Sequence, residues 1–170
     1  ILQPGPGVGG HCIAVDPWFI VDSAPEQSRL IYTARLVNDS MPSFILEKIR
    51  QAAEHIDKEL ANLTIACFGL AYKPDIDDLR ESPALNIAQQ VGLMGFGRLI
   101  VVEPHICILP PGFDAATVDL VDLDAAMEDA DVVVFLVDHA PFKTMDLSLL
   151  SDKQVVDTRG TWAGAQSKVG

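Results

Sequence analysis

The chain has 170 residues, of which 49% are hydrophobic and 21% are charged, and its 24 Asp and Glu residues outnumber 12 Lys and Arg residues. This apolar content is sufficient for a packed core and excludes disorder as the main state. The formal net charge of -12 repels phosphate polymers and anionic lipid, so we expect neither nucleic acid nor a membrane surface as a partner. The length suits one domain with an additional element.

Three features indicate the cellular context. The longest uninterrupted apolar run, residues 132–137, is far shorter than the roughly 20 residues that a membrane-spanning helix needs. Cys12, Cys67 and Cys107 are widely spaced and odd in number, which favours a reducing compartment over a disulfide framework. The chain begins with Ile1 and has no basic stretch that leads into an apolar segment. We therefore expect a cytoplasmic protein of which this chain is one piece.

Residues 1–22 are rich in Gly and Pro and end in an apolar stretch, which predicts a loop followed by a short helix. Apolar residues then recur at helical spacing over residues 23–61, with Ser23 as the expected N-cap. Pro42 lies within this pattern and predicts either a kink or two helices that join near residues 38–40. A helix this long, striped on one side, is typical of packing against something outside its own domain.

After residue 61 the pattern changes to short apolar runs that alternate with helical stretches. Such alternation predicts right-handed crossovers and an open parallel sheet. The expected strands are residues 63–68, 99–102, 117–121, 132–137 and 154–156, and the expected helices are residues 82–93, 124–129 and 145–150. The predicted fold class is therefore α/β, with a long helix followed by a Rossmann-like open parallel sheet and flanking helices.

Open parallel sheets bind ligands beyond the carboxyl ends of their strands, so the segments that follow the expected strands are candidate sites. Lys73, Arg80 and Arg159 lie in these segments and are three of only 12 basic residues. They could bind a diphosphate, and Arg80 also precedes a predicted helix N-terminus. The alternative is that Lys73 and Arg80 only neutralise the three aspartates between them.

A glycine-rich turn at the start of the chain is the other candidate site. Gly5, Gly7 and Gly10 fit the G-x-G-x-x-G spacing, but no strand–turn–helix unit surrounds them, so a dinucleotide site is not indicated. Such a turn also lets the backbone approach a ligand and presents N–H groups beside a nucleophile. The sequence therefore directs attention to the residues that follow the turn.

Cys12 follows this turn directly. It could lie at the start of the next helix, where the positive end of the helix dipole stabilises a thiolate. Asp16, four residues later, reaches the same site if the turn is tight. A lone cysteine in such a loop is more often inert than catalytic, so both interpretations stay open on these residues alone.

The remaining cysteines and histidines indicate little chemistry. Cys67 lies in an expected buried strand, where cysteine acts as a small hydrophobe. Glu103, His105 and Cys107 alternate along a strand end, but no second pair of ligands accompanies them, and we expect no metal site. His139 follows the fourth expected strand and either lines the ligand cleft or is structural.

Residues 7–18, G-V-G-G-H-C-I-A-V-D-P-W, resemble the catalytic-cysteine motif of the UDP-glucose/GDP-mannose dehydrogenase family. Residues 69–83 and 157–162 resemble two further motifs of that family in order and spacing. The resemblance covers the whole chain, and the three motifs together are far more specific than any one alone. It favours the catalytic interpretation of Cys12.

The resemblance implies the four-electron oxidation of a nucleotide sugar's primary alcohol to a carboxylate, with two NAD used in succession. Cys12 would trap the aldehyde as a thiohemiacetal, which yields a thioester on the second oxidation and is then hydrolysed. Asp16 matches an aspartate that positions or activates water. Among the substrates of the family we expect UDP-N-acetylmannosamine, with UDP-N-acetylglucosamine and UDP-glucose as alternatives.

The resemblance also implies binding roles. Lys73 and Arg159 match residues that contact the nucleotide sugar, and Arg80 matches a basic residue that faces the phosphates of NAD. The glycines that match a sugar-contacting loop are Gly7, Gly9 and Gly10.

By the same resemblance the chain has three parts. Residues 1–22 are the catalytic-cysteine loop and a short helix, residues 23–61 the central helix of a homodimer, and residues 62–170 a UDP-sugar-binding Rossmann-like domain. The family's NAD-binding domain and its catalytic lysine are expected outside this chain, so the piece alone should not turn over. A non-catalytic nucleotide-binding or dimerisation module is the alternative for the piece.

Overall fold

One parallel sheet organises the structure, a computed structural model that describes residues 3–162. Its five strands lie in the order β3-β2-β1-β4-β5, and every neighbouring pair is parallel. The strands are β1 (Thr64–Phe68), β2 (Arg98–Val102), β3 (Val118–Leu120), β4 (Val132–Phe135) and β5 (Gln154–Asp157). The predicted open parallel sheet of an α/β fold is confirmed, and the carboxyl ends of all five strands share one edge.

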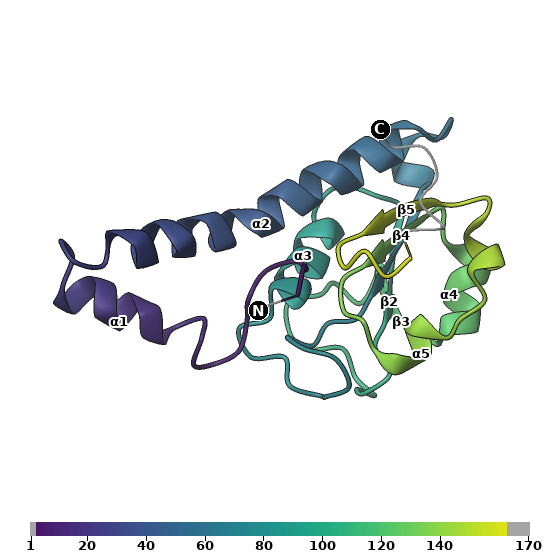
Figure 1. Ribbon diagram of the computed structural model, residues 1–170. Helices are drawn as coiled ribbons and strands as arrows, with labels where there is room; N and C mark the ends of the chain where they lie inside the picture. The colour runs from purple at the N-terminus through teal and green to yellow at the C-terminus, as the bar shows by residue number, and fades with distance from the viewer. Residues whose placement is uncertain (1–2, 163–170) are drawn as a thin grey trace.

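Helices cover both faces of the sheet (Figure 1). In chain order the helices are α1 (Asp16–Ser23), α2 (Arg29–Glu54), α3 (Pro83–Gly92), α4 (Leu123–Asp129) and α5 (Ala140–Lys143), and of these α1 lies alongside α2, beyond the sheet. Successive strand side chains point to opposite faces, so Ile65 and Cys67 join the core under α2 and α3, whereas Ala66 and Phe68 join the core under α4 and α5. This alternation explains why the strands read as continuous apolar runs.

α2 is the longest element, and its first half extends beyond the sheet with α1 alongside (Figure 1). The second half is buried against the sheet through side chains that include Ile45 and Ile49. The first half leaves large apolar side chains in solvent, among them Leu30, 82% exposed, and Val37, 61% exposed. None of the helices in residues 3–162 is both long enough and apolar enough to cross a bilayer.

The start of the long helix differs from the prediction. α2 begins at Arg29, and Ser23 is instead the last residue of α1, with its hydroxyl bonded back to the Phe19 carbonyl. A hydroxyl engaged in this way cannot cap a following helix. Pro42 lies within an uninterrupted helix, so the alternative of two helices that join near residues 38–40 is wrong.

Of two further helix predictions, one is confirmed and one changes. Ser82 caps α3 as expected, because its hydroxyl accepts the Leu85 N–H at 3.3 Å. The helix expected at residues 145–150 is only a 3₁₀ turn, Leu147–Leu150, and α5 precedes it. Pro in the first turn of α5 suits a helix start, but a helix of only four residues is too short to show a helical periodicity in the sequence.

Candidate functional site

The glycine loop of residues 5–10 packs against the start of α3 and the segment after β1. A Cβ atom on Gly9 would lie 2.4 Å from the Glu81 carbonyl oxygen and 2.7 Å from Cδ of Pro83. Gly10 has φ of +86°, and a Cβ there would lie 3.0 Å from Cε2 of Tyr72. Only glycine permits so close an approach at both positions. The loop is therefore fitted to this one surface of the sheet domain.

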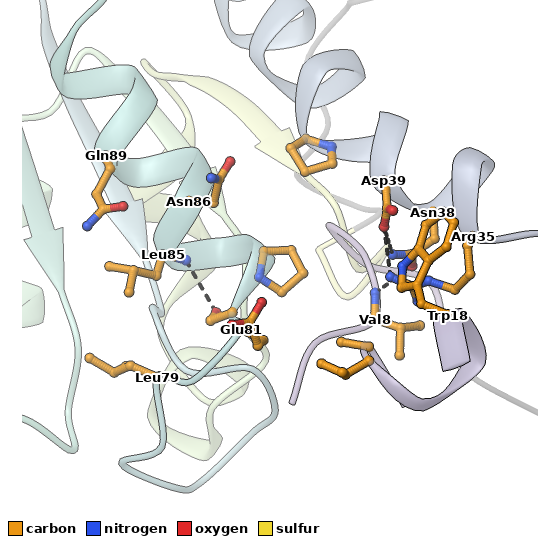
Figure 2. A pocket seen from close by; sticks show the side chains of 15 residues that line it. Val8, Trp18, Arg35, Asn38, Asp39, Leu79, Glu81, Leu85, Asn86 and Gln89 are labelled. Atoms are coloured by element: carbon orange, nitrogen blue, oxygen red, sulfur yellow. Dashed lines mark hydrogen bonds and ion pairs between the residues drawn. The ribbon is translucent and has the colours of Figure 1, made fainter. Parts of the chain in front are cut away.

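The other side of the loop is bound to α2. Asn38 Oδ1 accepts a hydrogen bond from the Val8 N–H at 2.7 Å, and Arg35 pairs with the neighbouring Asp39 at 2.7 Å (Figure 2). Pro42 has no N–H to donate to the Asn38 carbonyl, its usual helical acceptor one turn earlier. The helix thus bonds the loop at the turn where its own hydrogen-bond ladder is interrupted.

A cavity of about 560 Å³ is lined by the loop, α1, α2 and the first turns of α3 (Figure 2). Arg35 lines it with a side chain that is only 10% exposed and whose Nε has no partner within residues 3–162. Asp39 and Glu81 also line it. One cation against two carboxylates does not provide the positive wall that a diphosphate needs. A diphosphate site must therefore be sought at the other basic residues.

Cys12 lies in the turn between the glycine loop and α1, and its side chain is exposed. Its carbonyl accepts hydrogen bonds from the N–H groups of Val15 at 3.0 Å and Asp16 at 2.8 Å. The turn is therefore tight, as the proximity of Cys12 and Asp16 requires. α1 begins at Asp16, so Cys12 precedes the helix by one turn and does not start it.

Lys73 follows β1 in an exposed position. Its Nζ lies 5.5 Å from the centroid of the Tyr72 ring, the same ring that contacts Gly10. Among the described residues Lys73 forms no ion pair with the nearby aspartates, so its charge is available to a ligand. Tyr72 thus connects the segment of Lys73 to the glycine loop.

Arg80 is engaged differently. Its guanidinium donates to the Asp78 carboxylate, with 2.9 Å from Nε to Oδ1 and 2.6 Å from Nη2 to Oδ2. These hydrogen bonds lower the pKa of Asp78 to about 2. For Arg80, this contact fits the alternative that it neutralises a nearby aspartate. The Arg80 side chain is nevertheless 67% exposed and keeps an open edge toward solvent.

Arg159 lies in a turn after β5 whose backbone is hydrogen-bonded to the Asp157 side chain. The Asp157 carboxylate accepts the N–H groups of Arg159 at 2.8 Å, Gly160 at 2.9 Å and Trp162 at 2.7 Å. The Trp162 ring is buried and stacks on Phe135 with 4.0 Å between the centroids. Residues 157–162 therefore combine a carboxylate-capped turn with an aromatic anchor.

The Arg159 side chain reaches the start of the glycine loop. Nη1 donates to the Pro4 carbonyl at 2.9 Å, and Nη2 pairs with Asp138 Oδ1 at 3.1 Å. A Cβ atom on Gly5 would lie 2.6 Å from Nη1. Arg159 thus lies against the start of the loop that bears Cys12, whereas Lys73 adjoins the loop through Tyr72.

The other candidate residues have structural surroundings. Cys67 is fully buried in β1, and desolvation raises the pKa of its thiol to about 12. β2 ends at Val102, so Glu103, His105 and Cys107 do not alternate along a strand. Glu103 turns inward and is buried, whereas Cys107 is exposed.

Two residues that build the site, Asn38 and Tyr72, are not among those predicted from the sequence. Asn38 was visible only as a polar residue before Pro42 in a helical pattern. Tyr72 adjoined Lys73, but no periodicity indicated that its ring would meet Gly10. Both residues are recognisable only once the loop is seen docked.

Comparisons with known proteins identify the family of the chain. Residues 66–164 match the UDP binding domain, and residues 1–40 the central domain, of the UDP-glucose/GDP-mannose dehydrogenase family. The chain belongs to this family. It is 53% identical over 163 residues to an NDP-N-acetyl-D-galactosaminuronic acid dehydrogenase of Ralstonia nicotianae. It is 52% identical over 166 residues to the UDP-N-acetyl-D-mannosamine dehydrogenase of Salmonella typhi.

These alignments cover 96% and 95% of the chain but only 37% and 39% of the relatives. The chain therefore spans less than two fifths of the length of these curated dehydrogenases. A solved UDP-N-acetylmannosamine dehydrogenase from Pyrococcus horikoshii superposes with a TM-score of 0.78 at 30% identity, over 95% of this chain and 37% of that one. The enzyme Cap5O from Staphylococcus aureus gives 0.71 at 33% identity, over 95% of this chain and 35% of its own.

Proposed function

We propose that the protein containing this chain is an NAD-dependent nucleotide-sugar 6-dehydrogenase that oxidises UDP-N-acetylmannosamine to UDP-N-acetylmannosaminuronate. The observation that carries the proposal is the docking of the Cys12 loop, which places Gly10 on Tyr72 beside Lys73 and bonds Pro4 to Arg159. The loop that bears Cys12 thus contacts Arg159 directly and contacts Tyr72, the neighbour of Lys73. The names of the relatives favour an N-acetylhexosamine over glucose.

In this proposal the basic residues bind the nucleotide. Lys73 is exposed, without an ion pair among the described residues, and offers its ammonium to the diphosphate. Arg159 exchanges its contact with Asp138 for the nucleotide sugar. The glycines that let the backbone approach the sugar are Gly7, Gly9 and Gly10.

Cys12 performs the covalent step. Its thiolate attacks the aldehyde carbon, a C–S bond forms, and the carbonyl electron pair takes up a proton to give the thiohemiacetal. Loss of a hydride from this carbon and of a proton from its hydroxyl group gives the thioester. Water positioned by Asp16 then attacks, the C–S bond breaks, and the thiolate leaves as the carboxylate forms. NAD, when bound, accepts one hydride in each of the two oxidations.

The described residues do not form an NAD site by themselves. The glycine loop lies outside any strand–turn–helix unit, where a dinucleotide fingerprint has to lie. Arg80 offers one exposed guanidinium edge to the cofactor phosphates, as the family resemblance implies. We therefore assign turnover to the full-length protein.

α2 supplies a dimer contact in the same proposal. Apolar side chains of its first half, including Leu30 and Val37, are exposed in the single chain. A second copy of the helix would remove them from water. The central part of the chain is thus proposed as the homodimer interface.

Cys12→Ser in the full-length enzyme tests the catalytic assignment. We expect steady-state production of uronic acid to fall at least about a thousandfold, because a hydroxyl without an adjacent base is a far weaker nucleophile. Cys107→Ser, which removes another exposed thiol, should retain activity. Unchanged acid formation by Cys12→Ser would refute the proposal, and a panel of UDP-sugars assayed with the wild type would identify the hexose.

Calorimetric titration of the present chain separates its binding roles. UDP binding without NAD binding supports the assignment of residues 62–170 to the nucleotide sugar. Binding of neither ligand would favour a structural module instead.

A further inference from the structure

Glu103 and His139 form a buried polar pair that the proposed chemistry does not use. Both side chains are 0% exposed, and His139 Nε2 lies 3.1 Å from Glu103 Oε2. Glu103 follows β2 and His139 follows β4, the two neighbours of β1. Burial of a carboxylate is unfavourable unless hydrogen bonds compensate it. We therefore expect this buried pair to fix a neighbouring segment of the backbone.

The backbone around the pair fixes its protonation. Glu103 accepts the N–H groups of Leu70 at 2.7 Å, Ala71 at 3.2 Å and His105 at 3.1 Å. Burial raises the pKa of Glu103, but the hydrogen bonds from His139 and Leu70 outweigh burial and lower the pKa below its ordinary value. The carboxylate is therefore ionised and fully satisfied.

His139 completes the connection. Its Nδ1 accepts the Asp75 N–H at 2.9 Å. A backbone N–H can only donate, so Nδ1 carries no proton, and Nε2 donates its proton to Glu103. Asp75 returns the contact, because its Oδ1 accepts the Ala140 N–H at 2.8 Å. Asp75 also has φ of +59°, a conformation that a non-glycine residue adopts only when its surroundings hold it.

The consequence is that one short segment is clamped at both ends. Glu103 binds the backbone of Ala71, and His139 binds the backbone of Asp75. Tyr72 and Lys73 lie between these two points. The Tyr72 ring contacts Gly10 of the glycine loop, and Lys73, whose Nζ lies over that ring, carries the charge proposed to bind the diphosphate.

Two other roles fit the geometry less well. Asp75, His105 and His139 offer atoms within 4.8 Å of one another, the spacing of a metal site. Both ring nitrogens of His139 are already engaged, and a metal would have to displace one of these bonds. In dinucleotide-binding sheets an acidic residue after the second strand contacts a ribose, but Glu103 points inward to the backbone instead.

We propose that Glu103 and His139 are positioning residues that set the Tyr72–Lys73 segment for nucleotide-sugar binding. The inference rests on the proposed function, because it takes Lys73 as a substrate contact. It predicts that loss of the pair weakens binding of the UDP-sugar through Lys73 and leaves NAD unaffected.

A double-mutant cycle in the full-length enzyme tests this. His139→Phe keeps a ring of similar shape without hydrogen bonds, and we expect about a tenfold rise in KM for the UDP-sugar with less than about a twofold change in KM for NAD. His139→Gln restores a donor and an acceptor and should recover most of the affinity. In a Lys73→Met background, His139→Phe should add less than about twofold.

Controls separate positioning from general loosening. Phe142→Leu disturbs the aromatic neighbour of His139, whose ring centroid is 5.5 Å away, without removing these hydrogen bonds, and should change KM for the UDP-sugar less than His139→Phe. Should His139→Phe fail to fold by circular dichroism, Glu103→Gln replaces it in the cycle with the same expectation.

Multiplicative effects of His139→Phe and Lys73→Met, equal rises in both KM values, or no rescue by Gln would overturn the positioning role. An unchanged KM in Lys73→Met would remove Lys73 from the site and the positioning role with it. If the wild-type enzyme oxidises no UDP-sugar, the proposed function itself fails, which is a separate result.

Discussion

At the residue scale, the three cysteines show how surroundings decide chemistry. Cys12 and Cys107 are exposed, whereas Cys67 is fully buried in β1. Burial removes water from the Cys67 thiolate, which raises the pKa from 9.0 to about 12. The same side chain is therefore a candidate nucleophile at position 12 and a hydrophobe at position 67.

This difference predicts a pH dependence of stability. Between pH 9 and 12 the unfolded chain loses the Cys67 proton while the folded chain keeps it, so the contribution to stability is complete below pH 9 and falls as pH rises. At pH 10 the loss should be roughly 1 kcal/mol. Urea denaturation at pH 8 and pH 10 measures it, and Cys67→Ala should reduce the difference between the two. Equal pH dependence in both proteins would show that Cys67 is not the cause.

At the element scale, the glycine loop and α3 differ in whether they need the glycine that they contain. Gly9 admits the Glu81 carbonyl where a Cβ would stand only 2.4 Å away. Gly92, the last residue of α3, has space, since a Cβ there would meet only Leu99 Cδ2 at 3.5 Å and Val118 Cγ2 at 3.8 Å. The loop requires glycine, but the helix does not.

The substitution of alanine for glycine should therefore stabilise the protein at one position and destabilise it at the other. Gly92→Ala should stabilise the fold by about 0.5–1 kcal/mol, because alanine is the better helix former. Gly9→Ala should destabilise the docked loop by about 1–3 kcal/mol through the enforced shift, and uronic acid formation should fall with it. Thermal denaturation and the dehydrogenase assay measure the two outcomes. A Gly9→Ala enzyme with wild-type activity would show that the loop docks differently from this structure.

At the scale of the whole molecule, α1 and α2 form an arm that leaves the sheet domain (Figure 1). The second half of α2 is buried in the core, but its first half has exposed apolar side chains such as Leu30 and Val37. Contiguous exposed apolar surface is typical of an interaction site. In the proposed function, a second copy of this arm covers it.

Charge on this surface should weaken the proposed dimer. Leu30→Glu combined with Val37→Glu places two carboxylates in an apolar contact, and we expect the dissociation constant to rise at least about a hundredfold. Sedimentation velocity of the full-length enzyme measures it. Leu93→Glu, at a side chain 86% exposed just after α3, is the matched control and should leave the dimer intact. A double variant that stays dimeric would place the interface elsewhere.

The sequence by itself determined the sheet and the candidate chemistry. The apolar run at residues 132–137 can be satisfied only in the middle of a layered structure, and Ser82 with Pro83 specifies a helix start by local hydrogen bonding. The motifs around Cys12, Lys73 and Arg159 were complete in the sequence, so the candidate residues and the family could be named from it.

Only the tertiary structure decided how these residues meet. The bond between Val8 and Asn38 spans 30 residues, that between Arg159 and Pro4 spans 155, and that between His139 and Glu103 spans 36. Helix and strand periodicities describe neighbours one or two turns away and carry no information at these separations. The physical reason is that local hydrogen bonds select elements, whereas burial of their common surfaces selects the contacts between them.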